Sequence, residues 1–114
     1  MENKKEYVLA FLPTALQDMT EIISTFIMLG SPQGAVRIKD KINKAAIQIQ
    51  CFPYSGITVP DDKLAKFGFR MIVIEKYLLL YKVFEDEAKV IVYHILNGST
   101  EYPTLMQHLY QLDE

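Results

Sequence analysis

The side chains most able to do chemistry in this chain lie on, and just after, a run of three predicted strands. Arg70 lies in the first of these strands, His94 lies in the third, and the polar segment at residues 99–101 follows directly. Neighbouring antiparallel strands can bring such residues together, and an arginine with a histidine can bind a phosphate or support acid–base catalysis. An arginine near a sheet core also needs an anion or a carboxylate. Arg70 and His94 are therefore the candidate catalytic residues, although a strand histidine is more often satisfied by a neighbouring group.

The patterns of the common cofactor and metal sites are missing from the sequence. It contains no Walker-type loop, no glycine-rich dinucleotide fingerprint, no nucleophile elbow and no pair of closely spaced Cys or His ligands. His94 and His108 are far apart and lack companion ligands. Asp61 and Asp62 are adjacent, so regular structure cannot point both the same way, and we expect loop or capping acids rather than a catalytic pair. We predict no cofactor and no metal.

One cysteine, Cys51, excludes an internal disulfide, and its place at the end of an apolar helix favours burial as a small hydrophobe. The N-terminus carries both signs of charge, unlike a secretory signal. No apolar run approaches the ~20 residues of a membrane span. With 114 residues, half of them hydrophobic, we expect a single cytoplasmic domain over residues 1–114 that does not bind a membrane.

Charge is distributed unevenly along the chain. The net charge of −2 argues against bulk nucleic-acid binding, but residues 31–76 carry a local +4 and residues 77–114 a local −4. Such asymmetry can steer a charged partner to one side of a small domain. A basic stripe on the second predicted helix is either a solvated helix face or a binding surface. The candidate binding residues are Arg37, Lys41 and Lys44 of this stripe, and Glu101.

The elements that position these residues begin with the three strands, predicted at residues 69–74, 77–83 and 89–96. Glu75 and Lys76 suit a tight hairpin, and a charged turn follows the second strand, so an antiparallel meander is expected. Apolar residues fall on both parities of these strands, whereas a half-solvated sheet should alternate apolar and polar residues. Either another part of the chain or a partner must therefore cover the second face.

Two amphipathic helices precede the meander. A short strand at residues 7–11 leads into a helix at residues 13–29, where Thr14 and Gln17 resemble a capping box. The second helix begins with Ser31 as its cap and ends before Phe52 and Pro53. The short connection makes the two helices an antiparallel hairpin.

Residues 57–66 are predicted to form a loop with one helical turn, and a short helix opens at Tyr102 and Pro103. The apolar face predicted for this last helix consists of Leu105, Leu109 and Leu112, with Met106 beside it. The fold class is therefore α+β: an N-terminal strand, a helical hairpin on a three- to four-stranded antiparallel sheet, and a short C-terminal helix.

The order of these motifs resembles the RelE/ParE superfamily of type II toxins, which includes plasmid stabilisation proteins. The resemblance spans residues 7–106, and no single motif in it is specific. The matching pieces are Ala15 with Asp18-Met19, Phe52-Pro53 with Gly56, Leu64, Arg70-Met71-Ile72-Val73, and Tyr77-Leu78-Leu79-Leu80-Tyr81-Lys82-Val83. By resemblance, Arg70 matches a basic position of the family.

This resemblance implies a toxin held inactive by a cognate antitoxin. Members of the superfamily either cut messenger RNA on the ribosome or, in the ParE branch, poison DNA gyrase. Leu78 stands where the RelE-type nucleases carry an arginine, His94 and Asn97 stand where many ParE-like chains have an arginine and a histidine, and Thr100 replaces another common basic residue. RNA cleavage in this family relies on several cations around the phosphate, so their loss disfavours the nuclease function.

A ParE-like toxin that binds an essential target is accordingly favoured over a metal-independent endoribonuclease. A degenerate toxin that only binds its partner is a third alternative. The partners implied by the resemblance are an antitoxin and either gyrase or the ribosome with its mRNA; a homodimer is left open.

Overall fold

The computed structural model describes residues 5–112, in which the predicted meander forms the centre of a five-stranded sheet. Its strands β3 (Phe69–Ile74), β4 (Tyr77–Phe84) and β5 (Lys89–Asn97) pair antiparallel. At one edge β1 (Val8–Phe11) pairs parallel with β5, and at the other the two-residue β2 (Ile57–Thr58) pairs antiparallel with β3. The α+β prediction is confirmed, although the sheet has five strands and three or four were predicted.

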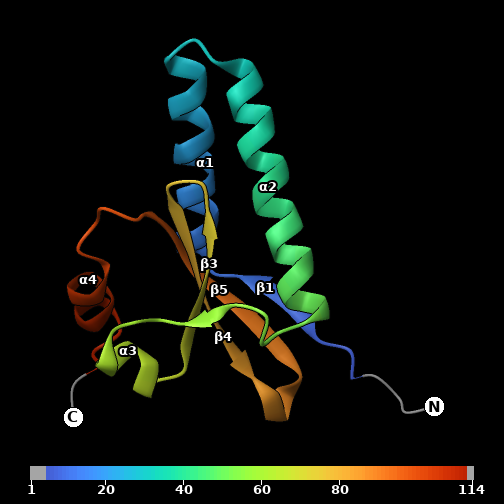
Figure 1. Ribbon diagram of the computed structural model, residues 1–114, viewed down its shortest axis with the longest axis vertical. Coiled ribbons are helices and arrows are strands. Elements are labelled where there is room, and N and C mark those ends of the chain that lie inside the picture. Colours follow the sequence, from blue (N-terminus) through green and yellow to red (C-terminus); the bar gives the residue numbers. More distant parts are fainter. Residues whose placement is uncertain (1–4, 113–114) are drawn as a thin grey trace.

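The predicted helical hairpin consists of α1 (Pro13–Met28) and α2 (Pro32–Cys51), which run side by side over one face of the sheet (Figure 1). Gly30, with a φ of +79°, allows the sharp turn between them. The Ser31 side chain accepts a hydrogen bond from the Gly34 N–H at 3.1 Å, as its predicted capping role requires.

The predicted capping box at the start of α1 is wrong. Leu12 holds the cap position without a side-chain hydrogen bond, and Pro13 is the first helical residue. The Thr14 hydroxyl donates instead to the Tyr93 carbonyl oxygen of β5 at 2.8 Å. The side chain therefore joins the helix to the sheet, an interaction between distant residues that a local sequence pattern does not contain.

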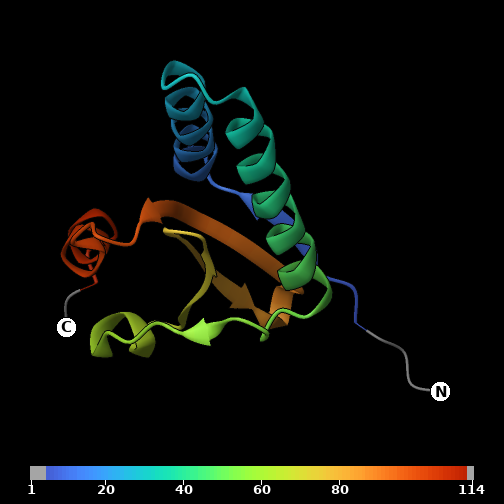
Figure 2. The ribbon, with the colours of Figure 1, turned by 45° about the horizontal axis from the view of Figure 1, so that its top comes forward.

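Two hydrophobic clusters lie on the two faces of the sheet. The first is between the sheet and the helical hairpin, and contains Ile38, Ile42 and Ile49 of α2 against Leu79 and Tyr81 of β4. The second is on the opposite face, where α3 (Asp62–Lys66) and α4 (Tyr102–Leu109) lie (Figure 2). Its buried members are Val59, Leu64, Phe69, Met71, Leu80, Met106 and Leu112. The chain thus covers part of the second face itself.

The C-terminal helix buries a different set of side chains from the one predicted. Met106 is fully buried and Leu112 nearly so, whereas Leu109 is 47% exposed. The helix ends at Leu109, and the chain then turns through Gln111, whose φ is +53°, so that Leu112 folds back onto the cluster. Met106 fills the contact with the sheet because its long, flexible side chain adapts to irregular space.

Candidate functional site

Arg70 is held by the loop between α2 and β2. Its Nη2 donates to the Gly56 carbonyl oxygen at 2.7 Å and to that of Tyr54 at 3.1 Å, while Nη1 donates to Thr58 Oγ1 at 3.4 Å. The guanidinium carbon also lies 5.3 Å from the centroid of the Tyr54 ring. The sequence predicted an anion or a carboxylate as the partner of Arg70, but its partners are backbone carbonyl oxygens. Arg70 thereby holds this loop against the edge of the sheet.

His94 is buried on β5, with 6% of its surface exposed. Its Nδ1 lies 2.8 Å from Asp18 Oδ2 on α1, and its ring packs edge-on against the ring of Tyr110, with 6.1 Å between centroids. Within residues 5–112, its Nε2 is buried without a hydrogen-bond partner. The carboxylate of Asp18 fixes the orientation of the imidazole from the helical side.

The structure does not bring Arg70 and His94 together. Arg70 pairs with Tyr81 across β3 and β4, and His94 pairs with Leu80 across β5 and β4, so β4 separates them. Two strand spacings amount to about 10 Å between their backbones. Each side chain also has its own partners, and a joint catalytic role for the pair stays a prediction of the sequence.

The basic stripe of α2 is largely neutralised by the protein itself. Arg37 Nε and Lys41 Nζ both contact Glu75 Oε2, at 2.9 Å and 3.0 Å. The hydrogen bond from Arg37, followed by that from Lys41, lowers the pKa of Glu75 to about 2. Lys44 pairs with Asp40 one turn away. The stripe therefore ties the hairpin to the β3–β4 turn, where Glu75 has a φ of +56°.

Glu101, the fourth predicted binding residue, lies at the cap position of α4 on an exposed part of the surface. Its side chain makes no capping hydrogen bond to the helix. The preceding turn is held by Asn97 Oδ1, which accepts hydrogen bonds from the backbone N–H and the hydroxyl of Ser99 at 2.9 Å and 2.8 Å. Glu101 therefore takes no part in the ion pairs of the α2 stripe, which are made by Glu75 and Asp40.

An exposed cluster around Glu85 was not predicted from the sequence. The Glu85 carboxylate accepts hydrogen bonds from the Tyr54 hydroxyl at 2.7 Å, from the Tyr7 hydroxyl at 2.9 Å and from Lys5 Nζ at 3.0 Å. These bonds, that of Tyr54 foremost, lower the pKa of Glu85 to about 2, and the same bond raises the pKa of Tyr54 to about 12. The cluster joins three segments that are distant in sequence, which is why no local pattern indicated it.

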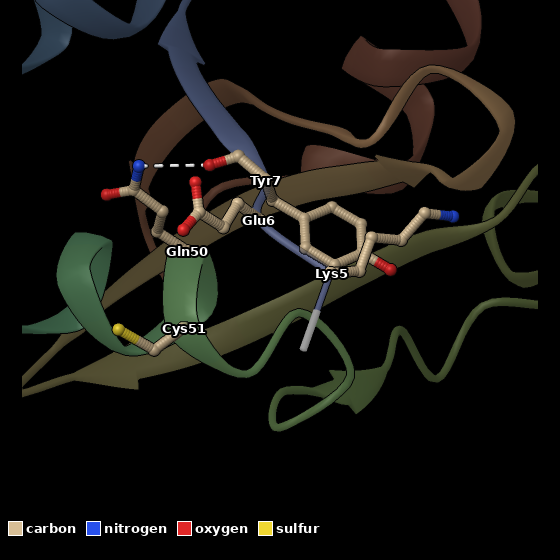
Figure 3. Close-up of a pocket in the computed structure, with 5 residues that line it drawn as sticks. All are labelled: Lys5, Glu6, Tyr7, Gln50 and Cys51. Carbon is tan, nitrogen blue, oxygen red and sulfur yellow. Dashed lines mark hydrogen bonds between the residues drawn. The ribbon is translucent and has the colours of Figure 1, made fainter. Parts of the chain in front are cut away.

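Beside this cluster lies a shallow pocket lined by the N-terminal segment and the end of α2 (Figure 3). Gln50 Nε2 donates to the Tyr7 carbonyl oxygen at 3.0 Å. Cys51 is exposed, so the expected burial of this residue is wrong: it falls on the outer side of the last turn of α2. Residues 5–112 contain no group of three or more His, Cys, Asp or Glu side chains placed to bind a metal ion.

The second face of the sheet carries apolar side chains at the position where the family resemblance pointed to a possible arginine. Leu78 is partly buried and packs against the cluster beneath α3 and α4. The same cluster contains an edge-to-face pair of Phe69 and Tyr93 with centroids 5.0 Å apart. Leu78 therefore contributes packing and brings no positive charge to this face.

Comparison with known proteins agrees with this architecture. A chain of the chromosomal ParDE toxin-antitoxin system from P. aeruginosa matches with a TM-score of 0.67 and 17% identity, over 82% of this chain and 98% of that chain. A chain of the toxin-antitoxin complex RelBE2 from Mycobacterium tuberculosis matches with a TM-score of 0.50 and 16% identity, over 88% and 100%. At these identities the likeness shows the fold alone. None of the curated proteins compared with the chain matches it.

None of the helices among residues 5–112 is long and apolar enough to cross a membrane.

The sequence family described as the ParE toxin of the type II toxin-antitoxin system parDE matches residues 9–102. The match runs from β1 to the start of α4 and so includes both faces of the sheet. The chain therefore belongs to the ParE toxin family of type II toxin-antitoxin systems.

Proposed function

We propose that this ParE-family toxin arrests growth by binding DNA gyrase, and that a cognate antitoxin neutralises it by covering part of its surface. The observation that carries the proposal is the family match over residues 9–102. A toxin that acts by binding a protein target needs no catalytic side chains of its own. Action by binding is therefore compatible with the structure, in which Arg70 and His94 each have a partner within the chain.

The arrangement of cations supports binding over RNA cleavage. Cleavage in the RelE manner requires several cations aimed at one phosphate, because stabilising the charge of the transition state is usually the largest catalytic contribution. Here Arg37 and Lys41 are engaged by Glu75, and Arg70 by backbone carbonyl oxygens. Leu78 is part of an apolar cluster.

Controlled expression in a bacterial host tests this proposal. Growth arrest with intact transcripts, broken DNA and an induced damage response is the expected result. Co-expression of the cognate antitoxin, sought among the open reading frames next to this gene, should restore growth. Arrest with cut transcripts and intact DNA would instead establish the endoribonuclease alternative. Normal growth without the antitoxin would indicate a degenerate toxin and overturn the proposal.

A double variant, Arg70→Gln with His94→Gln, separates binding from catalysis. Both side chains have structural partners, so folding of the variant is first checked by circular dichroism and thermal unfolding. A folded variant that still arrests growth supports action by binding. Lys39→Gln is the matched control, because Lys39 is exposed on α2 and lies outside the candidate catalytic and binding residues.

A further inference from the structure

One end of the second sheet face has no helix over it. Phe69, Lys82, Ile91 and Ala10 are successive cross-strand partners from β3 to β1, so they share a face. Phe69 belongs to the cluster beneath α3 and α4, which identifies this as the second face. Both ribbon views place α3 and α4 away from the β4–β5 turn (Figures 1 and 2).

Beyond Phe69, this face forms a surface that belongs to neither hydrophobic cluster. We call it the Lys82 shelf. It consists of Val8, Ala10, Lys82, Phe84, Lys89 and Ile91. Val8 is 61% exposed, and the other five side chains are partly exposed. A half-exposed apolar surface on a strand edge is a common feature of binding sites.

Lys82 lies in the middle of the shelf without a counter-ion. Its Nζ lies 5.3 Å from the Phe69 ring centroid and 5.2 Å from that of Phe84. No carboxylate among residues 5–112 pairs with it, whereas the neighbouring Lys89 has Glu87 at 3.9 Å. Burial lowers the pKa of Lys82, so the surrounding surface disfavours its charge.

The charges and apolar groups of the Lys82 shelf favour a protein segment over a nucleic acid as its partner. A nucleic acid needs several cations to replace its counterions. The Lys82 shelf instead contains two cations, Lys82 and Lys89, and Lys89 already pairs with Glu87 at 3.9 Å. A single carboxylate set among apolar side chains fits better, because it would neutralise Lys82 while its neighbours cover the aromatic and aliphatic groups.

We propose that the Lys82 shelf is a docking surface for the antitoxin, and that it receives an apolar antitoxin segment carrying one aspartate or glutamate that pairs with Lys82. This inference rests on the proposed function. Charge complementarity supports an acidic occupant, because Lys82 is a partly buried cation that contacts two aromatic rings and has no carboxylate partner among residues 5–112. In the free toxin, the partial burial of the Lys82 charge is unfavourable, and pairing with a carboxylate of the partner would remove this free-energy cost.

The test uses the full chain and its purified cognate antitoxin, which is first sought among the open reading frames next to the gene. Lys82→Met keeps the length and apolar stem but removes the charge, and Lys82→Arg keeps the charge. Lys39→Met is the matched control on α2, because Lys39 is an exposed lysine of that helix outside the candidate binding residues. Equilibrium titration gives the dissociation constant of each complex, and thermal unfolding gives the stability of each free toxin.

Lys82→Met should weaken binding by about tenfold to a hundredfold, the loss expected for one charged hydrogen bond. Its free form should be at least as stable as the wild type, because an unfavourable buried charge has been removed. Lys82→Arg should retain most of the affinity, and Lys39→Met all of it. A purely structural role for Lys82 would lower stability instead.

Unchanged binding by Lys82→Met, or an equal loss in Lys39→Met, would overturn the docking surface and leave the proposed function standing. A wild-type chain that does not bind the purified protein would overturn the proposed antitoxin and the docking surface with it. Loss of binding to a labelled single-stranded oligonucleotide in Lys82→Met, with binding to the protein intact, would assign the shelf to nucleic acid and overturn the inference.

Discussion

The carboxylate of Asp18 on α1 accepts a hydrogen bond from the backbone N–H of Ile95 on β5 at 2.9 Å, through the same oxygen that contacts His94. Strand β1 pairs with β5 only as far as Val92, so the rest of this edge has no neighbouring strand. Helix α1 therefore completes the hydrogen bonds of the sheet edge with its side chains. Unpaired edge groups would otherwise offer a template for another chain.

Asp18→Ala should destabilise the protein by about 1.5–3 kcal/mol, because it leaves a backbone N–H and a buried imidazole without their charged partner. Urea unfolding measures the free energy, and hydrogen exchange should show faster exchange at the Ile95 amide. Asp40→Ala is the control, since the one ion-pair partner of Asp40 among residues 5–112 is the exposed Lys44. Equal effects of the two substitutions would contradict the role of Asp18.

Tyr81→Phe should cost about 1–3 kcal/mol by stranding two buried backbone groups. The fully buried Tyr81 hydroxyl donates to the Pro53 carbonyl oxygen at 2.7 Å and accepts from the Gly56 N–H at 3.0 Å. Tyr77→Phe is the matched control, because the Tyr77 hydroxyl makes no hydrogen bond to any residue from 5 to 112. Denaturant midpoints that are the same for both variants would show that Tyr81 does not anchor the loop.

Gly56→Ala should also destabilise the chain, because the added Cβ would come within 2.5 Å of the Tyr81 hydroxyl and 2.7 Å of the Met71 carbonyl oxygen. The carbonyl belongs to the β2–β3 ladder and cannot move without breaking the pairing of Ile57 with Met71. Thermal unfolding checks the effect. A melting temperature equal to that of the wild type would mean that the loop has another conformation.

Stability should fall in acid partly through Glu75. Its pKa is lowered from 4.5 to about 2, first by Arg37 and then by Lys41. A carboxyl group with a lower pKa in the folded state stabilises the protein above its unfolded pKa, and this contribution is lost as the pH falls through the folded pKa. The contribution of Glu75 is therefore present above pH 4.5 and disappears between pH 4.5 and about 2.

Glu75→Gln tests this dependence by comparison with the wild type at each pH. The difference in unfolding free energy between the two proteins should be largest near neutral pH and shrink towards pH 2. Glu85, whose pKa is also about 2, keeps its own contribution in both proteins. A difference that stays constant over the whole range would exclude the ion pairs of Glu75 as its source.

Regular elements were predictable because their signals are local and repeated. Strand-length apolar runs located β3, β4 and β5, and the Ser31 cap with Pro32 located the start of α2. β2 was missed because a two-residue strand exists only through its pairing with β3. The second face could be recognised as apolar from the sequence, and the last helix was predicted with an apolar face that could cover it, but the contribution of α3 to this cover could not be predicted.

Side-chain partners were harder to predict than elements, because they join residues far apart in the chain. The sequence singled out Arg70 as needing an anion, yet its partners are carbonyl oxygens of a loop whose path the sequence does not show. The stripe of α2 was visible, but its neutralisation by Glu75 depends on where the β3–β4 turn lies. Lys82 was not predicted to be a site residue, because a single lysine on a strand has the same sequence pattern as a solvated surface lysine.

The most direct test of a ParE-like toxin that acts by binding is a cleavage assay with purified gyrase holoenzyme, supercoiled plasmid and ATP. Linear plasmid should appear after detergent and protease treatment in proportion to added toxin, and the folded Arg70→Gln, His94→Gln variant should produce it as well. The cognate antitoxin should suppress it. Intact plasmid at every toxin concentration, together with cut messenger RNA in a parallel reaction with ribosomes, would contradict the account.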